Sequence, residues 1–210
     1  MKPKKFYITG DTHGDPLRFI EGNMPGEQEW TASDYLIVCG DFGYVFTDSE
    51  AENQFLDFLA QKPYTICFCD GNHENFDMLS GYEISQWNGG KVHKIYGNLY
   101  HLMRGQIFEI EGKKIFTMGG GESADIEIRR DVNAWSKDEL PTQEELLEGA
   151  ENLEVAGYDM DVIVTHEPPL KVKSFLNLND NEMLRVTALN AYFEELASNC
   201  KFKKWFLWIK

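Results

Sequence analysis

The sequence predicts an α/β protein whose first part forms parallel β-α-β units and whose middle adds antiparallel strands. Short apolar runs rich in strand-forming residues recur along the chain, helix-start signals lie between the early runs, and the middle runs follow one another without such signals. Strands that alternate with helices favour parallel pairing, whereas strands in direct succession favour antiparallel pairing. Because the 210 residues contain no linker, repeat or low-complexity tract, we expect 1–210 to form a single domain.

The predicted strands share a short apolar core that is bounded by glycine, aspartate or another charged residue. This pattern is typical of strands that are buried on both faces. In chain order the predicted strands are Phe6–Thr9, Tyr35–Cys39, Thr65–Cys69, Ile107–Ile110, Lys114–Met118, Val162–Thr165 and Trp205–Ile209.

Capping signals predict where the helices begin. Asp15-Pro16 is typical of an N-cap followed by a first-turn proline, and it predicts a helix through about Gly22. Thr47–Glu50 and Thr142–Glu145 both have the pattern of a capping box, and apolar residues follow each at helical spacing. A late helix is predicted from an apolar face that consists of Leu189, Tyr192, Phe193 and Leu196.

A charged, irregular segment runs from Glu122 to Pro141. Loops of this length inside compact domains are more often functional than idle. Arg129 and Arg130 lie in this segment, and paired arginine donors suit a phosphate group. For Arg130 an exposed position without a ligand is an equally good interpretation, and Trp135 is better explained as a loop anchor than as a substrate contact.

The composition limits the classes of partner. With 20 Lys and Arg against 35 Asp and Glu, the formal net charge is −15, which argues against non-specific binding to long nucleic acids. The acidity does not exclude phosphate chemistry, because a bound metal ion inverts the charge of a small acidic site.

The cysteines and the apolar runs bear on location. Of the four cysteines none forms a CxxC pair, and Cys39, Cys67 and Cys69 fall inside predicted strands, so we expect buried free thiols and a reducing environment. No secretory signal precedes the first strand, and no apolar run approaches the roughly 20 residues that a membrane span needs. We therefore expect a cytoplasmic protein with no membrane partner.

Polar motifs follow four of the predicted strands. Gly10–Gly14, Gly40–Gly43 and Asp70–Glu74 come after the first three strands, and Thr165–Pro169 comes after a late one. Ligands of open α/β sheets gather beyond the carboxyl ends of the strands, so these loops are expected to converge. Aspartate, histidine and asparagine together suit divalent metals bound through oxygen and nitrogen, and the lack of cysteine in these loops argues against a structural zinc site.

The ordered set of D-x-H, GD, GNHE and a strand that ends in TH resembles the calcineurin-like metallophosphoesterases. The resemblance runs from Phe6 to the end of the chain. Less general features resemble a bacterial subgroup of single-domain members, namely Gly119–Gly121, Ser123–Asp125, Arg129, Trp135 and Glu139–Pro141. The resemblance implies a four-layer α/β/β/α sandwich of two mixed sheets flanked by helices, with metals at one edge.

The resemblance also implies roles for individual residues. Asp11 and His13 would hold a first divalent metal, Asn72 and His166 a second, and Asp41 would bridge both. His73 would touch the scissile phosphate and serve catalysis with Asp41, and Arg129 would bind substrate together with Asn72 and His73. The metals would be two divalent ions from among Mn, Fe, Zn, Mg and Ni, since all accept such ligands.

The implied activity is hydrolysis of a phosphomonoester, phosphodiester or phosphoprotein by a water that the dinuclear site activates. The expected partner is thus a small phosphorylated substrate or a phosphoprotein. A nuclease is the disfavoured alternative, because the charge balance is wrong for long DNA or RNA. The oligomeric state is left open.

Two departures from the family pattern qualify this expectation. Tyr44 stands where many members have an acid that orients the catalytic histidine. The final G-H-x-H motif is absent, because the last predicted strand is followed only by Trp208-Ile209-Lys210. We interpret this as a truncated or frame-shifted C-terminus, which reading the DNA past codon 207 in all frames would test. The alternative is a binding module with weak or no activity. Replacement ligands at His93 or His101 are disfavoured, since both lie in ordinary hairpin or strand positions.

Overall fold

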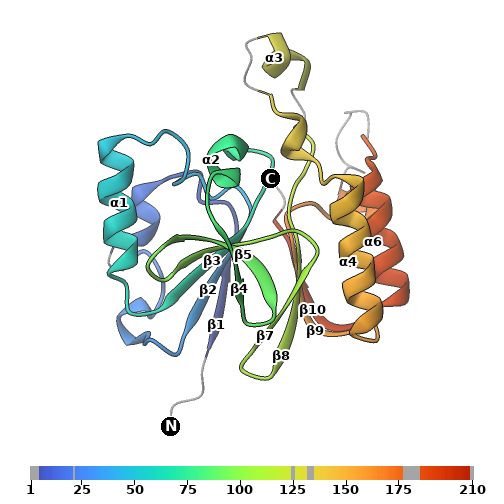
Figure 1. The fold of residues 1–210 in the computed structure, drawn as a ribbon, viewed down its shortest axis with the longest axis horizontal. Coiled ribbons are helices and arrows are strands. Elements are labelled where there is room, and N and C mark those ends of the chain that lie inside the picture. Colours follow the sequence, from blue (N-terminus) through green and yellow to red (C-terminus); the bar gives the residue numbers. More distant parts are fainter. Residues whose placement is uncertain (1–4, 21, 124–125, 132–134, 177–184, 209–210) are drawn as a thin grey trace.

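The computed structural model describes residues 5–20, 22–123, 126–131, 135–176 and 185–208. In this part of the chain two β-sheets face each other and helices cover the outer face of each (Figure 1). The predicted four-layer α/β/β/α architecture of two mixed sheets is therefore confirmed. No helix within the described ranges is long and apolar enough to cross a membrane.

The larger sheet has the strand order β1-β2-β3-β6-β5-β4 within the described residues. Its parallel part contains the first three predicted strands and β6, and its antiparallel part is β6-β5-β4. The bounds are β1 Phe6–Thr9, β2 Tyr35–Cys39, β3 Thr65–Cys69, β4 Ile84–Trp87, β5 Gly90–Tyr96 and β6 Leu99–Leu102.

The smaller sheet has the order β10-β9-β8-β7 in the same part of the chain. Strands β7 and β8 form an antiparallel pair, and β8, β9 and β10 run parallel. The bounds are β7 Gln106–Ile110, β8 Lys113–Met118, β9 Asp159–Thr165 and β10 Lys201–Phe206.

The connections supply the outer layers. Helix α1 lies outside the larger sheet, and α4 and α6 lie outside the smaller sheet, whereas α3 projects beyond the edge that the loops share (Figure 1). The bounds are η1 Pro16–Phe19, η2 Glu27–Glu29, α1 Glu50–Ala60, α2 Phe76–Ser80, α3 Ile126–Asp131, η3 Lys137–Glu139, α4 Gln143–Val155, α5 Leu170–Leu176 and α6 Ala188–Asn199.

Alternation along the strands builds a separate apolar cluster in each interlayer space. In β2, Ile37 and Cys39 pack between the two sheets, while Leu36 and Val38 pack on the opposite face of the sheet with residues of α1. Successive side chains of a strand point to opposite faces, so a continuous apolar run can fill two cores. A third cluster around Phe193 joins the smaller sheet to α4 and α6. The described cysteines are free and buried, as the sequence predicts.

Several predicted boundaries are wrong. The helix after Asp15 is only the short η1, although Asp15 does cap it. Ser49, not Thr47, is the N-cap of α1, because the Thr47 hydroxyl bonds instead to the side chains of Ser49 and Glu52. The capping box at Thr142 is confirmed. Residue 21 and residues 209–210, which the predictions included, lie outside the described residues.

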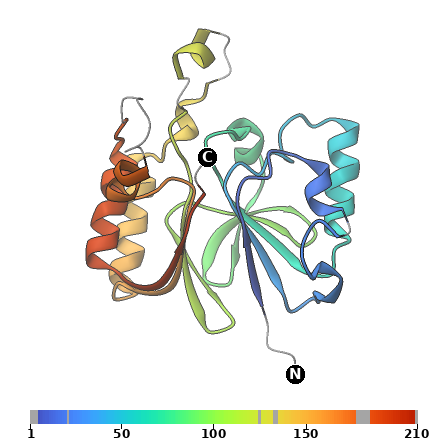
Figure 2. The same ribbon diagram turned by 180° about the vertical axis from the view of Figure 1, so that it is seen from behind.

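The last strand and the middle of the chain differ most from the prediction. Strand β10 begins at Lys201, where it pairs with Asp159 of β9, and not at the predicted Trp205. The prediction missed this start because the exposed lysines of the strand interrupt the apolar pattern. The short α2, α3 and α5 were not predicted, nor were the bounds of β4, β5 and β6. The carboxyl ends of the parallel strands meet at one edge, and the reverse view shows β10 ending at the same edge (Figure 2).

Candidate metal centre

The loops after β1 and β2 are joined by backbone hydrogen bonds. The amides of Thr12 and His13 donate to the carbonyl oxygen of Asp41 at 3.1 and 2.8 Å. His13 and Asp41 both have left-handed backbone conformations, with φ of 46° and 47°. Such conformations are unfavourable for residues with a Cβ and tend to persist at functional sites, where the surrounding structure imposes them. The two loops thereby hold Asp11, His13 and Asp41 together.

Glu74 connects the loop after β3 to the loop after β2. Its buried carboxylate accepts from the amides of Phe42, Gly43 and Gly71 at 2.8, 3.3 and 3.4 Å. Burial raises the pKa of Glu74 to about 8, and the amide donors act in the opposite direction. Glu74 of the GNHE motif therefore stabilises the loops after β2 and β3.

The loop after β3 passes very close to Asp41. A Cβ added to Gly71 would lie 2.1 Å from Asp41 Oδ1, so only glycine fits there. Two residues further on, the backbone amide of His73 donates to the same Asp41 oxygen at 2.8 Å. This close approach positions both Asn72 and His73 beside the Asp41 carboxylate.

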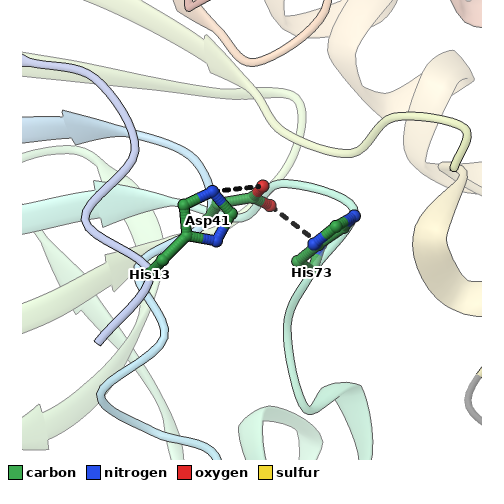
Figure 3. Close-up of side chains that lie close together, drawn as sticks. All are labelled: His13, Asp41 and His73. Atoms are coloured by element: carbon green, nitrogen blue, oxygen red, sulfur yellow. Dashed lines mark hydrogen bonds and ion pairs between the residues drawn. The ribbon is translucent and has the colours of Figure 1, made fainter. Parts of the chain in front are cut away.

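One group of potential ligands surrounds His13. His13 Nε2 lies 3.3 Å from Asp11 Oδ2 and 3.6 Å from Asp41 Oδ2. His13 and His73 lie on either side of the Asp41 carboxylate (Figure 3), and ligand atoms of these three residues come within 4.8 Å of one another. Asp41 is buried, while His13 is exposed at the mouth of the site.

The second group surrounds His166, which follows β9. His166 Nε2 lies 2.9 Å from Asn72 Oδ1 and 3.8 Å from Asp41 Oδ1. The other ring nitrogen, Nδ1, lies 3.0 Å from the carbonyl oxygen of Cys39, to which it donates. This bond leaves the lone pair of Nε2 directed at Asn72 and Asp41, as in metal-binding histidines whose second nitrogen donates to a carbonyl.

The residues present fit divalent cations. Asp11 Oδ1 is buried without a hydrogen-bond partner, and burial raises the pKa of Asp11. Two neighbouring buried carboxylates without a cation would be costly, so positive charge is needed between them. Asp11, Asp41 and His166 form a group of potential ligands, and Asp41 also belongs to the group with His13 and His73. Asp41 is therefore placed to contribute a ligand atom to both groups.

The predicted substrate residues line one pocket beside these ligands. Asn72, His73 and Arg129 all contribute to a pocket of about 450 Å³. Arg129 Nη2 lies 3.0 Å from His73 Nε2 and 3.3 Å from Nδ1. A guanidinium only donates, so a ring nitrogen bonded to it acts as the acceptor, which favours a neutral His73 ring.

Of the other residues singled out in the sequence, Trp135 lines this pocket, whereas Tyr44, Arg130, His93 and His101 do not. The Tyr44 hydroxyl donates to the carbonyl of Asp15, and its ring is buried in the outer core, so it does not take the place of an orienting acid. Arg130 stacks on the Trp135 ring at 4.1 Å. His93 and His101 bond to each other at 3.0 Å and are in neither potential metal group.

Three supporting contacts escaped prediction because they join distant segments. Asn72 Nδ2 donates to Ser123 Oγ at 3.0 Å, and the amide of Ser123 donates to Glu139 Oε2 at 3.1 Å. The ring of Trp208 lies against Gly10, where a Cβ would come within 1.8 Å of a ring carbon. The family resemblance marked Ser123 and Glu139, but no sequence signal indicates what they contact.

Comparison with known proteins identifies the family. Residues 4–195 match the family model described as calcineurin-like phosphoesterase. The chain belongs to the calcineurin-like phosphoesterases. Members of this family generally use divalent metal ions, and membership indicates hydrolysis of phosphoester bonds.

Comparisons with individual proteins add little to the family assignment. No curated protein sequence matches this calcineurin-like phosphoesterase. Among solved structures, a protein of unknown function from Aquifex aeolicus is 15% identical, with 96% of this chain and 90% of that chain covered and a TM-score of 0.39.

Proposed function

We propose that this calcineurin-like phosphoesterase hydrolyses a small phosphorylated molecule with two divalent ions at the site. Asp11 and His13 would hold one ion, Asn72 and His166 the other, and Asp41 would bridge them. One observation carries the proposal: the two oxygens of the Asp41 carboxylate face different ligands, with Oδ2 3.6 Å from His13 Nε2 and Oδ1 3.8 Å from His166 Nε2. Only a carboxylate offers two charged oxygens for such a bridge.

The chain's own residues would orient the phosphate and move the proton. Divalent ions supply Lewis acidity in sites of this kind. Arg129 would donate N–H groups to phosphoryl oxygens, which suits its place in the pocket beside His73. As water adds to phosphorus and the ester P–O bond breaks, a neutral His73 would take up the proton that the water loses and pass a proton to the leaving oxygen, so the net change is hydrolysis.

The charge of the molecule supports a small substrate. Of the described residues that line the pocket, Arg129 is the only lysine or arginine, and the chain carries a net charge of −15. A long polyanion needs a series of cationic contacts that such a pocket does not offer. We therefore propose a small phosphorylated molecule as the partner, with a phosphoprotein as the second choice and no long nucleic acid.

The decisive experiment is turnover of a chromogenic monoester and diester with Mn²⁺ by the wild type and Asp41→Asn. We expect Asp41→Asn to lower kcat/KM more than about 100-fold, beyond the 10- to 100-fold typical for loss of an outer partner of a metal ligand. Asp57→Asn, on the exposed face of α1, is the matched control and should retain full activity. Equal activity of wild type and Asp41→Asn would contradict the proposal. Bound metal without turnover in the wild type would favour a binding module.

A further inference from the structure

The pocket beside the candidate metal centre extends well beyond the phosphate-binding residues. Its volume of about 450 Å³ falls within the roughly 300–1,000 Å³ typical of sites for organic ligands. Its lining includes the aromatic residues Phe46, Phe76 and Trp135, hereafter the aromatic wall, together with His13, Asn72 and His73 of the metal centre. The pocket therefore has room for the alcohol part of an ester in addition to its phosphate.

Phe46 is held in place by its backbone while its ring stays accessible. Its amide donates to Glu52 Oε1 at 2.9 Å, and its carbonyl accepts from Asn75 Nδ2 at 2.6 Å. The Phe46 side chain is nonetheless 45% exposed. Since burial of an aromatic ring is favourable, an accessible ring on a fixed backbone inside a pocket is suited to contact a ligand.

The other two rings come from separate segments and are also held. Phe76 is the first residue of α2, whose N-cap is the same Asn75 that bonds to Phe46, so one side chain fixes both loops. Trp135 is half-buried, and the Arg130 guanidinium lies 4.1 Å from its ring. The aromatic wall is thus assembled before any ligand arrives, which reduces the ordering cost of binding.

The charged groups around the pocket leave room for an uncharged ring. Arg129 lies beside His73, and a guanidinium lies over each of two wall rings, Arg104 at 5.5 Å from Phe76 and Arg130 at 4.1 Å from Trp135. An uncharged planar ring at the wall meets no repulsion from these charges. Aromatic faces favour stacking with other rings over contact with saturated groups of the same size.

We propose that the aromatic wall binds a planar ring in the alcohol part of the substrate, an inference that rests on the proposed phosphoesterase function. The substrate class is then a phosphoester of an alcohol that bears an aromatic or heteroaromatic ring. Hydrolysis would break the P–O bond to that alcohol, water would supply the new P–O bond, and the ring-bearing alcohol would leave with a proton. Small aliphatic phosphoesters would be poor substrates.

Binding of non-hydrolysable phosphonates to the Mn²⁺-loaded protein tests the wall separately from catalysis. Benzylphosphonate and cyclohexylmethylphosphonate have the same charge and similar size, but only the first has a planar ring. We expect benzylphosphonate to bind more tightly to the wild type by about two- to twelvefold. Phe46→Ala and Trp135→Ala should each remove most of this preference and change cyclohexylmethylphosphonate binding little. Phe175→Ala, whose ring on α5 is 71% exposed, is the matched control.

The outcomes separate the two proposals. Equal affinity of the two phosphonates in the wild type would overturn the aromatic wall, as would variants that weaken both phosphonates equally. A ring preference without turnover of any ester would support the wall and refute the proposed hydrolysis. If a nucleoside monophosphate or a phosphotyrosine peptide is hydrolysed faster than glycerol 2-phosphate, the result supports both the aromatic wall and the proposed hydrolysis. Whichever of these two ring-bearing substrates is hydrolysed faster identifies the source of the ring. Faster turnover of glycerol 2-phosphate would overturn the wall.

Discussion

The amide of Asn72 is oriented by a neighbour that is distant in sequence. Its Nδ2 group donates to Ser123 Oγ at 3.0 Å, which leaves Oδ1 directed at His166 Nε2 at 2.9 Å. Ser123 is fully buried, and its own amide bonds to Glu139. If the side-chain amide of Asn72 were rotated so that its oxygen and nitrogen exchanged places, it would present N–H groups where the metal needs an oxygen ligand.

We therefore predict that Ser123→Ala weakens metal binding about 10- to 100-fold, the usual effect of losing an outer partner of a metal ligand. Titration calorimetry with Mn²⁺ measures this loss, and the thermal unfolding midpoint of the metal-free variant checks folding. If Ser123 acts through Asn72, then Ser123→Ala should have little further effect in an Asn72→Ala background. Fully additive losses in the double variant would contradict this role.

At the scale of the elements, helix α4 begins with a complete capping box. Thr142 Oγ accepts from the Glu145 amide at 3.2 Å, and Glu145 Oε2 accepts from the Thr142 amide at 2.7 Å. Thr142→Ala should lower the free energy of unfolding by about 1 kcal/mol, because an amide donor of the first turn loses its partner. Urea denaturation measures the change. Glu151→Ala, at an exposed position of the same helix, should change stability by less than about 0.5 kcal/mol.

Strands β5 and β6 carry a buried pair of histidines. His93 Nδ1 lies 3.0 Å from His101 Nδ1, and His101 Nε2 lies 3.2 Å from Asp70 Oδ1. Burial, and then the neighbouring His101, lower the pKa of His93 to about 4, although Asp70 acts in the opposite direction. Burial acts to raise the pKa of Asp70, but the Arg104 guanidinium and His101 outweigh it and hold this pKa below its usual range. Asp70 therefore titrates only in stronger acid than His93.

This pair predicts how stability depends on pH. Between pH 6.5 and pH 4 the unfolded state binds a proton at His93 that the folded state does not, so stability falls as the pH falls. The loss should approach about 3 kcal/mol across that window. Urea denaturation of the metal-free protein at several pH values measures it. In His93→Asn the stability should change less with pH in that range, and an unchanged slope would contradict the prediction.

For the molecule as a whole, stability depends on the core between the two sheets. Phe108 of β7 is fully buried in that core, together with residues of both sheets. Phe108→Ala should lower the free energy of unfolding by about 3–5 kcal/mol, because it leaves a cavity between the layers. Chemical denaturation measures the loss, with the exposed Phe175→Ala as the control. A change below about 1 kcal/mol would contradict this description of the core.

The parallel part of the fold was predictable because its strands are local apolar runs with sharp ends. Phe6–Thr9, Tyr35–Cys39 and Thr65–Cys69 form strands with the predicted bounds. Strand β10 was misplaced because an edge strand has exposed charges in place of an apolar run. The helix after Asp15 ended early because a cap signals where a helix begins and not how long it continues.

The sequence alone determined the candidate ligands, because each follows a recognisable strand within a few residues. That holds for Asp11, His13, Asp41, Asn72 and His166. Only the tertiary structure decided that Asp41 faces both groups, that His166 donates to Cys39, and that Ser123 orients Asn72. The aromatic wall likewise joins three separate segments. Such contacts depend on how two sheets pack against each other, and His166 and Cys39 are 127 residues apart. Local spacing carries no information about them.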